Sequence, residues 1–154
     1  MNPFDFDALR QARLKARRRM PNGARMTRFR WAEIEGAVWM FPAALTTPRD
    51  MAALCHESPC LADPEAHPLD AAFWLATAVR QDLWRALRPV PGLVPVVRAR
   101  PGPEPDLAQL RASALVSPHL KGPALLAVIR DLFQPDRLSA WSAWASAKAR
   151  RAAN

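Results

Sequence analysis

The chain of 154 residues has no tyrosine, two cysteines and five glycines. Cys55 and Cys60 are too few for the disulfide framework of a small secreted domain, which favours a reducing, cytoplasmic compartment. The glycines are isolated, so no glycine-rich phosphate loop exists, and GxSxG and HExxH motifs are also missing. The lack of tyrosine beside abundant alanine and arginine is typical of a GC-rich, bacterial coding sequence. We therefore expect a non-catalytic bacterial protein.

Long apolar runs are missing as well. No run approaches the roughly eighteen apolar residues that indicate a transmembrane helix. The first thirty residues lack the apolar core of a secretory signal, and Asp5 and Asp7 argue against an arginine-rich mitochondrial presequence. We expect a cytoplasmic protein that makes no membrane contact.

Acidic residues are absent from positions 10–30, whereas basic residues are concentrated there. The nine basic residues are Arg10, Arg13, Lys15, Arg17, Arg18, Arg19, Arg25, Arg28 and Arg30. Residues 1–30 carry a net charge of +7, and the remaining residues supply +1 of the total of +8. The protein is thus a basic arm, defined here as residues 1–30, attached to a nearly neutral body.

Such an arm suits a nucleic-acid backbone, because Lys and Arg release condensed counterions when they neutralise phosphates. Arg28 and Arg30 alternate with Phe29 and Trp31, and both guanidinium and aromatic planes stack on unpaired bases. We therefore predict that the nine basic residues contact RNA or single-stranded DNA in preference to duplex, with Phe29 or Trp31 stacking. The predicted role is that of a small subunit in a larger nucleoprotein complex, bound to other protein subunits.

Three alternatives remain open for this arm. It is a solvated charged face if the arginines reflect composition alone. It is a docking element if the protein is an adaptor or regulatory protein that binds an acidic partner. The third alternative is a small nuclease or toxin, for which His56, Glu57, His67 and Asp70 are the nearest set of catalytic side chains.

Sixteen prolines divide the rest of the chain, and many stand where a helix should begin. We predict a mostly or all-α fold, a small irregular bundle of about five to seven helices. The expected helices cover residues 5–20, 31–41, 47–56, 68–88, 105–116, 123–133 and 135–151. Within one domain, the basic arm (1–30) precedes a helical core (31–88), a proline-rich loop or linker (89–105) and a C-terminal helical segment (106–154).

Two stretches are ambiguous. Residues 27–41 show both an alternation typical of a strand and a helical spacing, and we favour a helix from Trp31 to Phe41. Residues 92–100 could form a short strand, and Pro95 would confine it to the edge of a sheet.

Six tryptophans are many for this length. Most fall on apolar helical faces and are expected in the core. Trp141 and Trp144 share one short alanine- and serine-rich helix that can hardly bury both, so we predict that they form a protein–protein interface.

Cys55, Cys60 and His67 have part of the spacing of a zinc site. A fourth ligand would have to come from His56, Asp63 or Glu65, and there is no second cysteine pair. We therefore expect no zinc and no other cofactor.

Overall fold

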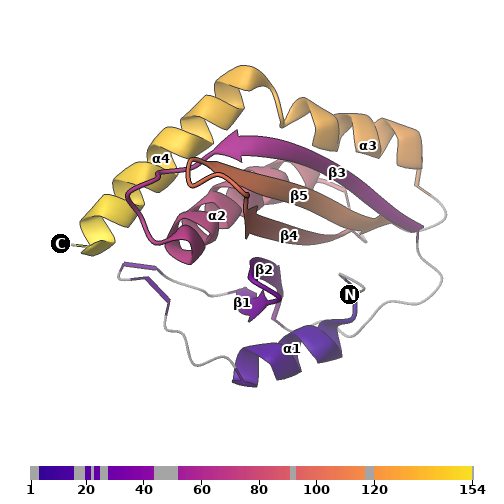
Figure 1. The fold of residues 1–154 in the computed structure, drawn as a ribbon. Coiled ribbons are helices and arrows are strands. Elements are labelled where there is room, and N and C mark those ends of the chain that lie inside the picture. The colour runs from indigo at the N-terminus through magenta and orange to yellow at the C-terminus, as the bar shows by residue number, and fades with distance from the viewer. Residues whose placement is uncertain are drawn as a thin grey trace.

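The computed structural model describes residues 4–15, 20–21, 23–24, 28–43, 52–90, 93–116 and 120–153. These residues form an α/β fold with four helices around one five-stranded antiparallel sheet (Figure 1). The elements are α1 (Phe6–Lys15), β1 (Phe29–Ile34), β2 (Ala37–Pro42), β3 (Ala52–Leu61), α2 (Pro68–Leu87), β4 (Val94–Pro101), β5 (Leu107–Val116), α3 (Gly122–Asp131) and α4 (Pro135–Ala153). The sheet order is β1-β2-β4-β5-β3. The predicted all-α bundle is therefore wrong.

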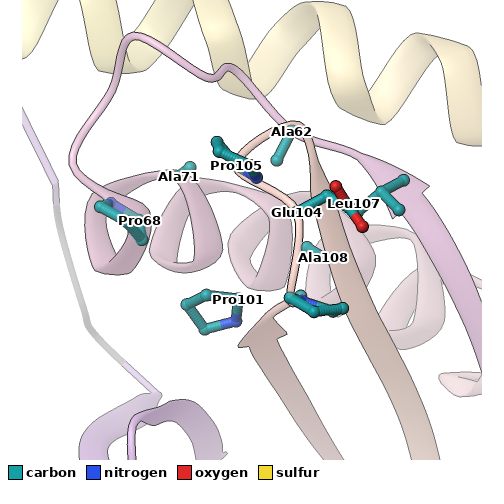
Figure 2. A pocket seen from close by; sticks show the side chains of 10 residues that line it. Ala62, Pro68, Ala71, Pro101, Glu104, Pro105, Leu107 and Ala108 are labelled. Atoms are coloured by element: carbon teal, nitrogen blue, oxygen red, sulfur yellow. The ribbon is translucent and has the colours of Figure 1, made fainter.

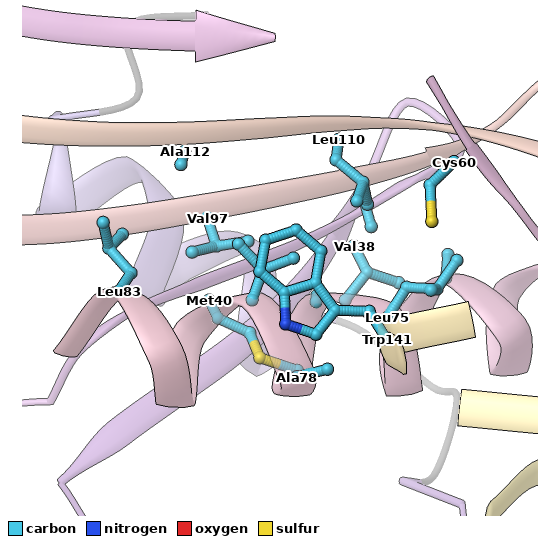
Figure 3. Close-up of a cluster of buried hydrophobic side chains, with 14 of the residues drawn as sticks. Val38, Met40, Cys60, Leu75, Ala78, Leu83, Val97, Leu110, Ala112 and Trp141 are labelled. Atoms are coloured by element: carbon cyan, nitrogen blue, oxygen red, sulfur yellow. The ribbon is translucent and has the colours of Figure 1, made fainter. Parts of the chain in front are cut away.

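Helix α2 covers one face of the sheet, called here the α2 face. Met40 of β2, Val97 of β4 and Leu110 of β5 point into the same apolar core as Leu75 and Leu83 of α2 (Figure 3). These side chains are at most 1% exposed. Helix α4 packs against α2 from outside and adds Trp141 to the core. Most of the buried apolar surface thus lies between the sheet, α2 and α4.

Helix α1 packs on the opposite face, called here the α1 face. Phe6 and Leu9 of α1 are fully buried against Trp39 and Phe41 of β2 and Val96 of β4. Helix α1 contacts mainly β1 and β2, so it lies over that half of the sheet. The first part of the basic arm is thereby attached to the body.

The helix predicted from Trp31 to Phe41 is instead the β1–β2 hairpin. Glu35 and Gly36 form its two-residue turn, with φ values of 52° and 73°, as a type I′ hairpin turn requires. Because α1 covers one face and α2 the other, both alternating sets of β2 side chains are buried. Such a strand appears as a continuous apolar run, which periodicity cannot distinguish from a buried helix.

The helix predicted at residues 105–116 is strand β5. Ala108, Ala112 and Ala114 alternate along the α2 face and are at most 1% exposed. Alanine favours helices on its own, but here its small side chain fills the space beneath α2. Tertiary packing therefore overrides local propensity in this segment.

The helix predicted at residues 47–56 is also wrong over its described part, because β3 begins at Ala52 and pairs with β5 along its whole length. Residues 44–51 lie outside the described residues. In strand β3, Pro59 is tolerated because β3 is an edge strand, and one side of its backbone has no neighbour among the described strands.

The proline-rich stretch 89–105 contains β4, which lies between β2 and β5. The prediction that Pro95 excludes a non-edge strand is therefore wrong. The pairing of β2 with β4 stops at Val97, so Pro95 has only Ala114 of β5 opposite it in the described register. The proline stands just beyond the doubly paired part of the strand, where a missing N–H is tolerated.

Four helix predictions are confirmed. Those at 68–88, 123–133 and 135–151 correspond to α2, α3 and α4, and that at 5–20 corresponds to α1 over its described part, which ends at Lys15. The starts of α2, α3 and α4 are set locally, by a proline in the first turn of α2 and of α3 and by Pro135 at the start of α4. Of the helices described, none combines the length and apolarity needed to cross a bilayer.

Candidate functional site

The basic arm is described in part. Arg10 lies on α1 and pairs with Asp7 at 3.4 Å. Arg28 is exposed where β1 begins, and the half-buried Arg30 donates from Nη1 to the Phe29 carbonyl at 3.0 Å. The backbones of Arg13 and Lys15 belong to α1. The remaining predicted contacts, Arg17, Arg18, Arg19 and Arg25, lie outside the described residues.

The two rings interleaved with the arginines are core residues. Phe29 and Trp31 are 5% and 7% exposed. Phe29 packs edge-on against Trp84, with 5.9 Å between the ring centroids, and Trp31 packs in the same way against Phe73, with 5.6 Å between the centroids. Strand alternation places both rings on the α2 face, whereas Arg28 and Arg30 point to the opposite side. In this arrangement the two rings are packed in the core and are not presented to bases.

The predicted interface tryptophans lie between α4 and α2. Trp141 is 3% exposed, and its indole N–H donates to Asp82 at 2.7 Å. Trp144 is partly buried and contacts Trp74 edge-on at 5.9 Å. Both therefore pack within this chain, because α2 supplies the second surface that the helix by itself lacks.

The candidate zinc ligands are separated. Cys55 and Cys60 are five positions apart on β3, an odd number, so they point to opposite faces of the sheet. Cys55 is exposed on the α1 face, whereas Cys60 is buried on the α2 face. His67 caps α2 by accepting the Leu69 N–H at 3.2 Å. Among the described residues, no group of three or more His, Cys, Asp and Glu side chains could hold a metal ion.

The four candidate catalytic residues are not brought together either. His56 lies on the α2 face against the Phe133 ring at 4.7 Å, and burial lowers its pKa. Glu57 points to the opposite face, and His67 and Asp70 stand at the start of α2. The described residues therefore give this set no shared site.

The sheet instead places three arginines and one glutamate together on the α1 face. In the strand register, Arg98 of β4 stands opposite Arg111 of β5, which stands opposite Glu57 of β3. Arg100 lies two residues along β4 and therefore on the same face. We call Arg98, Arg100, Arg111 and Glu57 the sheet-face cluster.

Glu57 holds two arginines through one oxygen atom. Arg111 donates from Nε to Glu57 Oε1 at 2.5 Å, and Arg98 Nη2 lies 3.4 Å from the same oxygen. The hydrogen bond from Arg111 keeps the pKa of Glu57 below its ordinary value. Burial, and then the charges of Arg111 and Arg100, lower the pKa of Arg98. The positive charges of the cluster thus oppose one another, and Glu57 is the counter-charge.

The cluster is accessible from solvent. Alternate residues of β3 on this face are exposed, including Cys55 and Glu57, and Arg100 is exposed on β4. Arg98 is 8% exposed and lies over the Trp39 ring at 5.8 Å, next to the part of the face that α1 covers. The cluster therefore forms a positively charged patch that is exposed at Arg100 and Glu57 and buried at Arg98.

Sequence reasoning missed this cluster because it assigns residues 89–105 to a loop or linker with at most a short edge strand, and residues 105–116 to a helix. The alternation of Arg98 and Arg100 in a β-branched segment was a signal for two arginines on one strand face. The pairing with Arg111 and Glu57 depends on strand register, which the sequence does not display.

A separate cavity of about 220 Å³ lies between the β4–β5 loop and the start of α2 (Figure 2). Its described lining is mostly apolar and includes Pro68, Pro101, Pro105 and Leu107, with Glu104 as its charged member. Few polar groups converge there, so the cavity lacks the features that orient a ligand.

The arrangement as a whole presents cations to solvent. The sheet-face cluster is suited to binding an anion, because guanidinium groups match phosphate and carboxylate geometry. No protein-family model, curated protein or solved structure matches this chain.

Proposed function

We propose that this protein is a non-catalytic nucleic-acid-binding protein whose basic arm contacts the phosphate backbone. The observation that carries the proposal is the run of nine basic residues without an acid between positions 10 and 30. Each phosphate that a basic residue neutralises releases counterions, which dominates sequence-independent affinity. The other subunits of a nucleoprotein complex would bind elsewhere on the body.

The attachment of α1 supports this reading over that of a loose charged tail. Phe6 and Leu9 bury one side of α1 against the sheet, so the helix that begins the basic run is fastened to the body. The other end of the basic run, at Arg28 and Arg30, joins the sheet at the start of β1. Both ends of the basic run are thus attached, which limits the conformational entropy lost on binding.

The proposal is tested by binding of single-stranded RNA, single-stranded DNA and duplex DNA across a salt series. We expect the logarithm of affinity to fall linearly with the logarithm of salt concentration. Replacing Arg17, Arg18 and Arg19 together by alanine should reduce the slope by about two and weaken single-strand binding by roughly a hundredfold in about 0.1 M salt.

The matched control replaces three exposed arginines on α2, its C-terminal cap and α3, namely Arg85, Arg88 and Arg130, by alanine. This variant loses the same charge, so an equal loss of affinity would show that net charge alone acts. Binding that is absent, or that does not respond to salt, would overturn the proposal and favour an acidic protein as the partner of the arm.

A further inference from the structure

The sheet-face cluster contains two positively charged side chains that repel each other across neighbouring strands. Arg98 and Arg111 are direct cross-strand partners, and like charges in that position destabilise a sheet. They are held together by Glu57, whose Oε1 lies within reach of both guanidinium groups. The carboxylate therefore occupies the position where an anionic oxygen is needed.

Glu57 neither neutralises the charge of the cluster nor pairs with all of its hydrogen-bond donors. One carboxylate faces three guanidinium groups, so two positive charges remain uncompensated. The Nε atom of Arg98 is buried and has no hydrogen-bond partner among the described residues. Arg100 is exposed and makes no ion pair with them. Buried unpaired donors are rare in folded proteins, and an acceptor oxygen from a ligand would remove this one.

The donors of the cluster suit a phosphate group. Arg98 is positioned by the Trp39 ring at 5.8 Å and by burial, so its guanidinium is oriented before a ligand arrives. Arg100 stands about 7 Å farther along the strand, which lets the cluster reach more than one anionic oxygen. Arginine binds phosphate oxygens through paired N–H groups, and Glu57, half-exposed, can turn away to admit them.

The position of the cluster favours a single strand over a duplex. Arg111 lies on β5, inside the sheet between β4 and β3, and not on a protruding element that could enter a groove. An open sheet face is a common platform for unpaired nucleotides. Trp39, beneath Arg98, also packs against α1, so the cluster and the start of the basic arm share the α1 face.

We propose that Arg98, Arg100 and Arg111 bind a phosphate group of single-stranded nucleic acid, which displaces Glu57 from the cluster. The inference rests on the proposed function for the identity of the ligand, while the site itself is separate from the basic arm.

The test measures single-stranded DNA and RNA binding to the full chain with R100Q, R111Q and E57Q variants. R100Q and R111Q should each weaken binding by roughly fivefold in about 0.1 M salt, the loss expected for one phosphate contact. E57Q should tighten binding by a similar factor, because the competing carboxylate is gone. Since E57Q acts in the opposite direction, its effect cannot be mistaken for partial unfolding.

The control is R88Q, which removes the same charge from the exposed end of α2. Cluster variants that behave like R88Q while the Arg17–Arg19 variant loses binding would overturn this inference and leave the proposed function standing. If the cluster variants weaken binding and the Arg17–Arg19 variant does not, the result would support the inference and reject the basic arm as the contact with nucleic acid. If the wild type binds no nucleic acid, both proposals fail.

Titration with inorganic phosphate and with a mononucleotide separates the two sources of a phosphate group. We expect weak binding of both, abolished by R111Q, and much tighter binding of the oligonucleotide. Phosphate binding that depends on Arg111, combined with oligonucleotide binding that does not, would assign the site to a free phosphate compound and overturn the single-strand proposal.

Discussion

At the scale of single residues, the β1–β2 turn contains a residue type that does not suit its backbone conformation. Glu35 has a φ of 52°, a left-handed conformation that costs most residues about 1–2 kcal/mol. A Cβ at Gly36 would meet nothing within 4 Å, so only backbone strain opposes a side chain there. Asn-Gly is the preferred pair for such a turn.

We predict that Glu35→Asn raises the free energy of unfolding by about 0.5–1 kcal/mol and that Gly36→Ala lowers it by about 1 kcal/mol. Urea denaturation of both variants measures the two changes. Equal and negligible effects would contradict the two-residue turn.

At the scale of elements, one carboxylate links α4 to α2 in addition to their apolar packing. Asp82 of α2 accepts the Trp141 indole N–H at 2.7 Å and lies 3.2 Å from Arg137 and 3.3 Å from Arg85. Trp141 is buried, so losing its acceptor leaves an N–H without a partner, whereas the two arginines remain in solvent.

We predict that Asp82→Ala lowers the free energy of unfolding by about 1–3 kcal/mol. Arg137→Ala should cost less than about 1 kcal/mol, as exposed ion pairs do. The double variant with Trp141→Phe provides the check, because Asp82→Ala should cost less once the donor is removed. Additive losses would show that the hydrogen bond does not couple the two helices.

At the scale of the whole molecule, the two cationic regions differ in whether they require the folded state. The basic arm is continuous in sequence and keeps its charge density when the chain unfolds. The sheet-face cluster draws Glu57, Arg98 and Arg111 from three strands and exists only in the folded state. A ligand raises thermal stability only to the extent that it prefers the folded chain.

A single-stranded oligonucleotide should therefore raise the melting temperature of the wild type and of the Arg17–Arg19 alanine variant when each is near saturation. It should raise that of an R100Q/R111Q variant far less, even where enough oligonucleotide is added to saturate it. Scanning calorimetry with and without oligonucleotide measures these shifts. If the melting temperature of the R100Q/R111Q variant rose as much as that of the wild type, the oligonucleotide would bind the folded state through residues outside the sheet-face cluster.

Part of the candidate site was accessible to sequence reasoning. The charge run of the arm needed no fold to be recognised, and the alternation of Arg28 and Arg30 with Phe29 and Trp31 was visible. Their division between two sheet faces was not, because it requires knowing that α2 covers one side and buries the rings. The alternation of Arg98 and Arg100 was also visible, but their pairing with Glu57 was not, because strand register brings Glu57 close to residues more than forty positions away.

The sequence by itself determined the helices α2, α3 and α4, because a proline in the first turn and the helical spacing of apolar residues act within each segment. It also determined that +7 of the net charge of +8 lies in residues 1–30. Only the tertiary structure decided the strands, because β2 is buried on both faces and β5 uses alanine for packing. The same sheet placed Arg98 and Arg111 opposite each other, since cross-strand pairing is a property of the assembled sheet.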